Sequence, residues 1–129
     1  MRMTDRQKAI SLQKMAETTL KRIKDTDIDK YASNALKDYY DTLHELMDAI
    51  SALDGIKISG DGAHEKLINY IAPKYNLPEK DRIFLQELRD LRNRITYEGL
   101  FIEPDYVKRN AVHIESLAQM LSRLITEKL

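Results

Sequence analysis

Residues 28–53 read IDKYASNALKDYYDTLHELMDAISAL, and this stretch decides the fold of the chain. Apolar side chains recur every three or four positions, which is the spacing of one face of an α-helix. The stripe comprises Ala32, Leu36, Tyr39, Leu43, Leu46 or Met47, Ile50 and Leu53. Gly55 follows and suits the left-handed conformation just past a helix end. The segment therefore predicts one long amphipathic helix.

The same periodicity predicts a helix on either side of this segment. The first starts at Thr4, where Gln7 completes a capping box, and ends in the acidic run 25–29. Its apolar stripe is Leu12, Met15 or Ala16, Leu20 and Ile23. The third helix is expected over residues 62–72, with Asp61 as its cap and Pro73 forcing its end.

Proline and glycine delimit the last two predicted helices. Pro78 is favoured at the first position of the fourth helix, and Gly99 ends it. Pro104 opens the fifth. The inward stripes are Phe84, Leu88, Leu91 and Ile95, then Val107, Ala111, Ile114, Leu117, Leu121 and Leu124 or Ile125. No segment alternates with period two, so we expect one all-α domain over residues 1–129, a five-helix up-and-down bundle without a sheet.

Composition narrows the class of protein. Lys plus Arg equals Asp plus Glu at 21 each, so the formal net charge is zero, which disfavours a strongly cationic nucleic-acid binder. There is no cysteine, and the three histidines show no metal-ligand spacing, so we expect no metal and no cofactor. No apolar run approaches the roughly 20 residues that span a bilayer, and no signal peptide is evident, so a cytoplasmic protein is expected.

The segment 88–101, LRDLRNRITYEGLF, carries the candidate chemistry. Three arginines fall within six residues at the end of the fourth helix, where Arg89, Asn93 and Thr96 neighbour Arg92. Tyr97 lies five positions after Arg92, on the last turn, so the two are expected to face one small pocket. Asp90 and Arg94 are expected to pair. The alternative is an ordinary surface of charged side chains with local ion pairs.

The stretch LRDLRNRITYEG resembles the signature region of HEPN domains, which occur in prokaryotic toxin–antitoxin and defence proteins. In that family an arginine, often followed by asparagine, precedes a histidine near the end of the penultimate long helix of an all-α bundle. Arg92 and Asn93 match the first two positions, and Tyr97 falls on the histidine. The long tyrosine-bearing second helix and helix order extend the resemblance over most of the chain.

The resemblance implies a metal-independent endoribonuclease that dimerises so that two motifs face each other. Arginine would stabilise charge on the phosphate, and histidine would transfer protons. Tyr97 departs from this pattern, since a phenol is a poor general base at neutral pH. Three explanations stay open: a non-catalytic module that binds RNA, a nucleotide or a protein; a ribonuclease using Arg92 and another proton carrier; or a tyrosine modified by a nucleotidyltransferase partner.

The resemblance and the motif together give the expected site. Arg92, Asn93 and Tyr97 are the candidate catalytic residues, and Arg89, Thr96 and Tyr40 the candidate substrate-binding residues. A homodimer is expected from the family and from the apolar Leu100 and Phe101 beside the motif.

Other polar residues are assigned structural roles. Of the adjacent Tyr39 and Tyr40, at most one is expected deep in the core, the other lining a cleft or a dimer face. His44 is expected to be half-buried or on the surface, with a position near the cleft as its alternative. His64 and His113 are expected on the surface. The acidic residues Asp41, Glu45 and Asp48 are expected on a solvated face, with pairing to Arg92 as the alternative. The segment 55–63, GIKISGDGA, lacks the lysine and preceding strand of a phosphate-binding loop.

Overall fold

The structure, a computed structural model, describes residues 3–129 and contains five α-helices over that range. They are α1 (Asp5–Lys24), α2 (Ile28–Leu53), α3 (Ala63–Lys74), α4 (Glu79–Glu98) and α5 (Pro104–Lys128). No strand occurs in this part of the chain, so the prediction of an all-α five-helix bundle is confirmed. Helix α2 has the predicted bounds.

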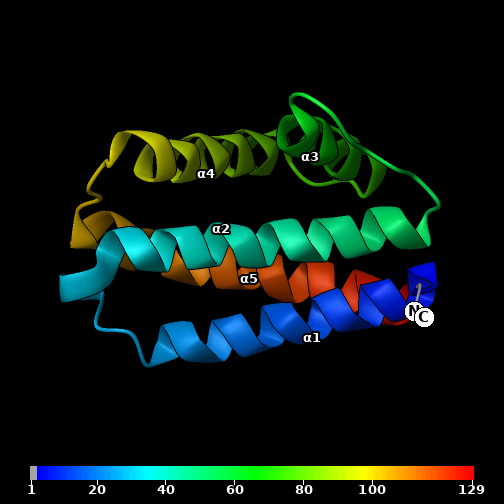
Figure 1. Ribbon diagram of the computed structural model, residues 1–129, viewed down its shortest axis with the longest axis horizontal. Helices are drawn as coiled ribbons and strands as arrows, with labels where there is room; N and C mark the ends of the chain where they lie inside the picture. Colours follow the sequence, from blue (N-terminus) through cyan, green and yellow to red (C-terminus); the bar gives the residue numbers. More distant parts are fainter. Residues whose placement is uncertain (1–2) are drawn as a thin grey trace.

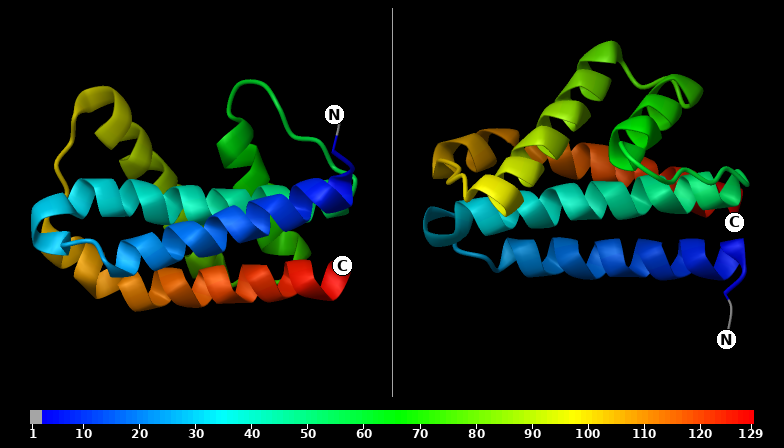
Figure 2. Two further views of the ribbon diagram at one scale, coloured as in Figure 1. Left: turned by 60° about the horizontal axis from the view of Figure 1, so that its bottom comes forward. Right: turned by 45° about the horizontal axis from the view of Figure 1, so that its top comes forward.

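Helix α2 lies at the centre of the bundle (Figure 1). Helices α1 and α5 run along one side of it, and α3 and α4 cover the other side (Figure 2). The start of α1 and the end of α5 meet at the same end of the molecule, where the Arg6 guanidinium donates to the Leu129 carbonyl at 2.8 Å. The central helix is therefore covered by helices on two opposite sides.

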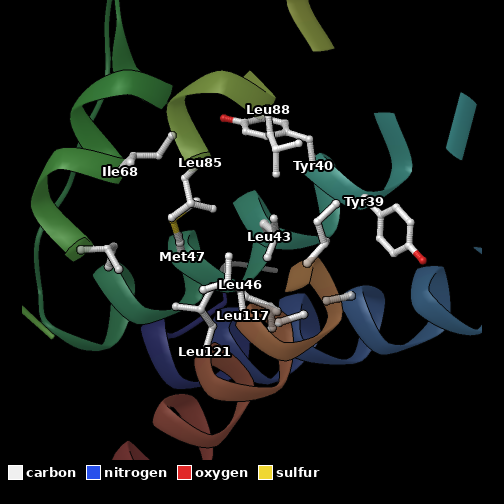
Figure 3. Close-up of a cluster of buried hydrophobic side chains, with 14 of the residues drawn as sticks. Tyr39, Tyr40, Leu43, Leu46, Met47, Ile68, Leu85, Leu88, Leu117 and Leu121 are labelled. Atoms are coloured by element: carbon white, nitrogen blue, oxygen red, sulfur yellow. The ribbon is translucent and has the colours of Figure 1, made fainter. Parts of the chain in front are cut away.

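This coverage explains why Tyr39 and Tyr40 are both buried, at 4% and 0% exposure. The prediction that at most one of them is deep in the core is wrong. Figure 3 shows the two rings on different sides of α2, with Tyr40 beside Leu88 of α4. The Tyr39 hydroxyl donates to Glu115 of α5 at 2.9 Å. Adjacent residues point apart around a helix, and here each direction meets another helix.

The helix ends follow the predicted capping chemistry in part. The capping box of Thr4 and Gln7 is confirmed. Helix α3 starts one residue later than expected, with Gly62 rather than Asp61 at its N-cap and no side-chain cap. Its end is also different, because Pro73 lies inside the helix, which runs to Lys74. Asn76, with a φ of 58°, is the residue that turns the chain.

One end of α4 lies where the sequence predicts it, and the other is shifted by one residue. The helix starts at Glu79, with Pro78 as its N-cap, one residue later than expected. Gly99 ends it in the left-handed conformation, as predicted.

The buried face of α4 is displaced from the predicted stripe. Asp81, Leu85 and Leu88 are buried, whereas Phe84, Leu91 and Ile95 are only partly buried. Helix α4 packs on both α3 and α2, and Leu85 and Leu88 are its apolar side chains that are fully buried. Leu85 is a core residue that the periodicity analysis did not include.

Candidate functional site

Arg92 is anchored against α2 rather than standing in solvent. Its side chain is 23% exposed, and its Nε lies 3.4 Å from Oδ1 of Asp41. Within residues 3–129 this buried Nε has no hydrogen-bond partner, so the contact is a loose ion pair and not a bidentate fork. Asp41 therefore pairs with Arg92, which was the alternative to a solvated position for the acidic residues. The guanidinium keeps capacity for another acceptor.

Tyr97 does not share this environment. Its side chain is 78% exposed on the last turn of α4. Side chains five positions apart diverge by about 140° around an α-helix. The expectation that Arg92 and Tyr97 face one small pocket does not fit this geometry.

The neighbouring candidate residues are placed differently from one another. Arg89 is half-buried, and its Nε donates to Gln86 at 2.7 Å. Asn93 is half-buried and Thr96 is exposed. Arg94 pairs with Glu98 at 3.4 Å instead of the expected Asp90. Arg89, three positions before Arg92, and Thr96, four positions after it, share its side of α4, whereas Asn93 is the next residue and points about 100° away around the helix.

Three exposed aromatic residues belong to segments that lie at the same end of the molecule, the start of α2 and the end of α4 with the connection after it (Figure 1). Tyr97 is 78% exposed, Phe101 is 89% exposed, and Tyr31 of α2 is 52% exposed. The connection after α4 is tied to α2, because the Ile102 amide donates to the Ser33 hydroxyl at 2.8 Å. The same region of α2 is bent, with non-helical backbone at Tyr31. We call Tyr31, Tyr97 and Phe101 the aromatic end.

His44 of α2 and His64 of α3 form a stacked pair of histidines. The rings of His44 and His64 are parallel within 9°, with centroids 3.8 Å apart. The Tyr40 hydroxyl lies 3.1 Å from Nδ1 of His64. The prediction of a surface position for His64 is wrong, whereas His44 is half-buried as expected. Only the folding of α3 onto α2 brings the two rings together, so sequence spacing carried no signal for the pair.

Burial and nearby cations hold both imidazoles neutral. Burial first, and then the neighbouring His64, lower the pKa of His44 to about 4. Burial and the charges of Arg92 and Arg89 likewise lower the pKa of His64. These couplings place both arginines within electrostatic reach of the histidines. Tyr40, a candidate substrate-binding residue, is 0% exposed, so its hydroxyl contacts His64 and cannot contact a substrate directly.

Glu45 lies one helical turn after Asp41, and its carboxyl group is half-buried. Within residues 3–129 its buried Oε2 has no hydrogen-bond partner. Burial and the charge of Asp41 raise its pKa to about 7. The assignment of Glu45 to a solvated face is therefore wrong, while Asp48 pairs with Lys8 at 3.8 Å near the surface.

Replacing Glu45 with glutamine is expected to stabilise the fold more at pH 8 than at pH 5. A raised folded-state pKa means that ionisation disfavours the native state as pH rises from the ordinary value of 4.5 to about 7. Thermal unfolding of both proteins at the two pH values measures the difference. An equal effect at both pH values would contradict the assignment. The matched control is Glu127→Gln, an exposed position at the end of α5.

His113 has a structural role that the sequence did not indicate. Its Nε2 lies 2.9 Å from Oδ1 of Asp81, a carboxylate on α4 that is 8% exposed. Its ring stacks on Phe84 with centroids 4.7 Å apart. The side chain of His113 is 42% exposed, which agrees with the predicted surface position, and it also makes these two contacts with α4.

Comparison of the chain with protein-family models, with curated proteins and with solved structures finds no match. None of the helices in residues 3–129 has the length and apolar character to cross a membrane. The same residues contain no cluster of three or more potential metal-ligating side chains.

Proposed function

We propose that this chain is a HEPN-like domain that binds RNA or a nucleotide through the C-terminal half of α4. It would act as a binding or regulatory module in a toxin–antitoxin or other RNA-related system. The observation that carries the proposal is the placement of Tyr97, which stands in solvent away from Arg92. Such a tyrosine suits stacking on a base better than proton transfer at a phosphate held by Arg92.

The aromatic end and the arginines supply the two components of single-strand recognition. Arginine attracts phosphate, and exposed aromatic rings stack on bases without sequence preference. Tyr31, Tyr97 and Phe101 are each more than half exposed. Because the net charge is zero, affinity has to come from this local surface rather than from the overall field.

Endoribonuclease activity is the second candidate, and the histidine pair favours it. Phosphodiester cleavage without metal needs a group that transfers protons near a phosphate-binding cation. His44 and His64 both lie within electrostatic reach of Arg92. In this alternative Arg92 stabilises the phosphate, the imidazoles transfer protons, and Tyr97 contacts the substrate.

The partners that we propose also use the end of α4. Tyr97 and Phe101 expose apolar surface beside half-buried Leu100, which suits a homodimer formed around the motif. The exposure of the Tyr97 hydroxyl also makes it accessible to a nucleotidyltransferase-type partner that modifies tyrosine.

Arg92→Ala is expected to weaken binding of a fluorescein-labelled single-stranded RNA about tenfold, since one charge-assisted contact contributes about 1.5 kcal/mol or more. Fluorescence anisotropy in EDTA measures the affinity, and gel analysis of the same samples detects cleavage. Arg123→Ala, an exposed arginine on α5, is the matched control and should bind as the parent does.

The outcomes separate the candidates. Binding without cleavage, lost in Arg92→Ala only, supports the binding module. Cleavage by the parent that Arg92→Ala abolishes establishes the ribonuclease. Cleavage by Tyr97→His but not by the parent shows that the fold supports ribonuclease activity and that tyrosine at this position abolishes it. Equal binding by the Arg92 and Arg123 variants, or no binding by the parent, overturns the proposal.

A further inference from the structure

A pocket of about 510 Å³ lies between the second half of α2, the segment 55–62 and the start of α3. His44 and His64 line it, together with Ser51 from α2 and with Lys57 and Ser59 from the connecting segment. Its volume is in the range of small-ligand sites. Arg92 and Tyr97 do not line it, so it is separate from the surface assigned to RNA.

The nitrogen atoms of the two histidines are arranged to serve a ligand. Nδ1 of His64 is engaged by the Tyr40 hydroxyl, and Nδ1 of His44 is buried without a partner in residues 3–129. In both rings Nε2 is therefore the nitrogen that a ligand can reach. With the buried Tyr40 hydroxyl donating, the proton of neutral His64 sits on Nε2. Parallel rings cannot direct both lone pairs at one metal ion, so hydrogen-bond donation is the role that remains.

The start of α3 strengthens the preference of this pocket for an anion. Ala63 and His64, the first residues of the helix, line the pocket, and the N-cap Gly62 supplies no side-chain cap. Backbone amides at a helix start carry partial positive charge and bind phosphate. The Ala63 amide donates to the Gly60 carbonyl at 3.2 Å, so of these two amides the one on His64 is left for a ligand, beside two imidazoles and Lys57.

The charges around the pocket are mixed, and their pairing decides the balance. Lys8 and Lys57 line it, as do Asp5 and Asp48. The Asp48 carboxylate lies 3.8 Å from Lys8, so part of its charge is already compensated. The charges of Arg89, Arg92 and Asp41 also act on the pKa of His64, although these residues do not line the pocket.

The larger pocket of the molecule offers no such preference. It measures about 600 Å³ and lies between α1 and α5, where apolar Ala16, Leu20, Leu46 and Ala118 alternate with polar residues that include Arg123 and Glu17. Arg123 is the one cation among its lining residues, and the Glu17 carboxylate opposes an anion there.

We propose that the pocket at the start of α3 binds a phosphate monoester, with His44 and His64 donating hydrogen bonds to its oxygens. The ester belongs to a mononucleotide or to the 5′ end of an RNA. A terminal phosphate presents three oxygens that can accept hydrogen bonds and carries more negative charge, whereas an internal phosphodiester presents two free oxygens and one charge. Lys57 and the α3 amides complete the set of donors.

The first test uses inorganic phosphate and AMP as probes, with calorimetry on the full chain. His64→Gln and Lys57→Glu are each expected to weaken binding tenfold or more. Lys57 is exposed, so its replacement leaves the fold intact even where His64→Gln does not. His113→Gln and Lys30→Glu are the matched controls and should bind within about twofold of the parent.

A second test uses sulfate, whose charge does not change between pH 4 and 7.5, a range that begins near the lowered pKa of His44, about 4. An anion favours protonated imidazole, so binding takes up a proton and affinity falls as pH rises. This dependence should vanish in the double variant His44→Gln/His64→Gln. It should persist in Glu45→Gln, the variant of the nearby carboxyl that titrates in the same range.

The outcomes are decisive either way. Absence of binding by the parent at millimolar phosphate and AMP overturns the proposal, as does equal binding by the Lys57 and Lys30 variants. Competition of AMP with a 5′-phosphorylated trinucleotide, but not with its 5′-hydroxyl form, identifies the RNA end as a second source of the group. Arg92→Ala should retain AMP binding, which separates this site from the RNA surface on α4.

Discussion

Replacing Leu43 with alanine is expected to lower the free energy of unfolding by about 3 kcal/mol. Leu43 is 0% exposed in the middle of α2 (Figure 3). Helices lie on both sides of α2, so the backbone has little room to collapse around the lost atoms. The cost therefore combines the lost transfer free energy with that of a residual cavity. Urea unfolding followed by circular dichroism measures it.

The control for this prediction is Val112→Ala, a change of a side chain that is 78% exposed on α5. Its effect should stay within about 0.5 kcal/mol. A loss below about 1 kcal/mol for Leu43→Ala would mean that the centre of α2 is less tightly packed than the structure shows.

Replacing Asp54 with alanine is expected to cost about 2–3 kcal/mol, because three donors lose their common acceptor. The carboxylate is only 8% exposed at the C-terminal cap of α2. It accepts from Tyr70 and Tyr75 of the α3 region, the first at 2.8 Å, and from Lys128 of α5 at 2.8 Å. One side chain thus ties three helices together where an acid alone would be disfavoured by the helix dipole.

The pH dependence of stability tests the same residue. Burial raises the pKa of Asp54, but the hydrogen bonds from Lys128, Tyr75 and Tyr70 outweigh burial and lower it overall. A lowered folded-state pKa gives stability that is present above the unfolded value of about 3.9 and is lost as pH falls through the folded value. The parent should therefore lose its advantage over Asp54→Asn below about pH 4.

The matched control is Asp105→Ala, which removes an exposed carboxylate paired with Arg109 at 2.8 Å. Exposed pairs four positions apart contribute about 0.3–0.5 kcal/mol. A similar, small loss in Asp54→Ala would show that its three donors find water or other acceptors in the folded chain.

Local signals predicted the helices well because they act within one or two turns. The stripe of α2, the Thr4 capping box and the left-handed Gly99 each depend on neighbours in sequence. The third helix does not end before Pro73, where the sequence predicts its end. Proline removes the hydrogen bond to the carbonyl four residues earlier, yet α3 runs one residue past Pro73, and the chain turns at the left-handed Asn76.

The candidate site also has one part that local sequence predicts and another that depends on contacts between helices. Arg92, Asn93 and Tyr97 were singled out from one helical segment, and the relation of Arg92 to Asp41 was foreseen only as an alternative. The stacking of His44 on His64 was not foreseen. These residues are separated by the end of α2 and a long connection, and no periodicity relates side chains across such a gap.

For this protein, periodicity and capping residues alone predict five helices and the all-α class, because hydrogen bonding and burial along a helix repeat with a known spacing. Which charged groups meet was decided by packing. Helix α2 is covered from two sides, so both Tyr39 and Tyr40 are buried, Asp54 receives donors from two other elements, and α3 brings His64 onto His44. Such contacts depend on the relative placement of whole helices, which no local pattern contains.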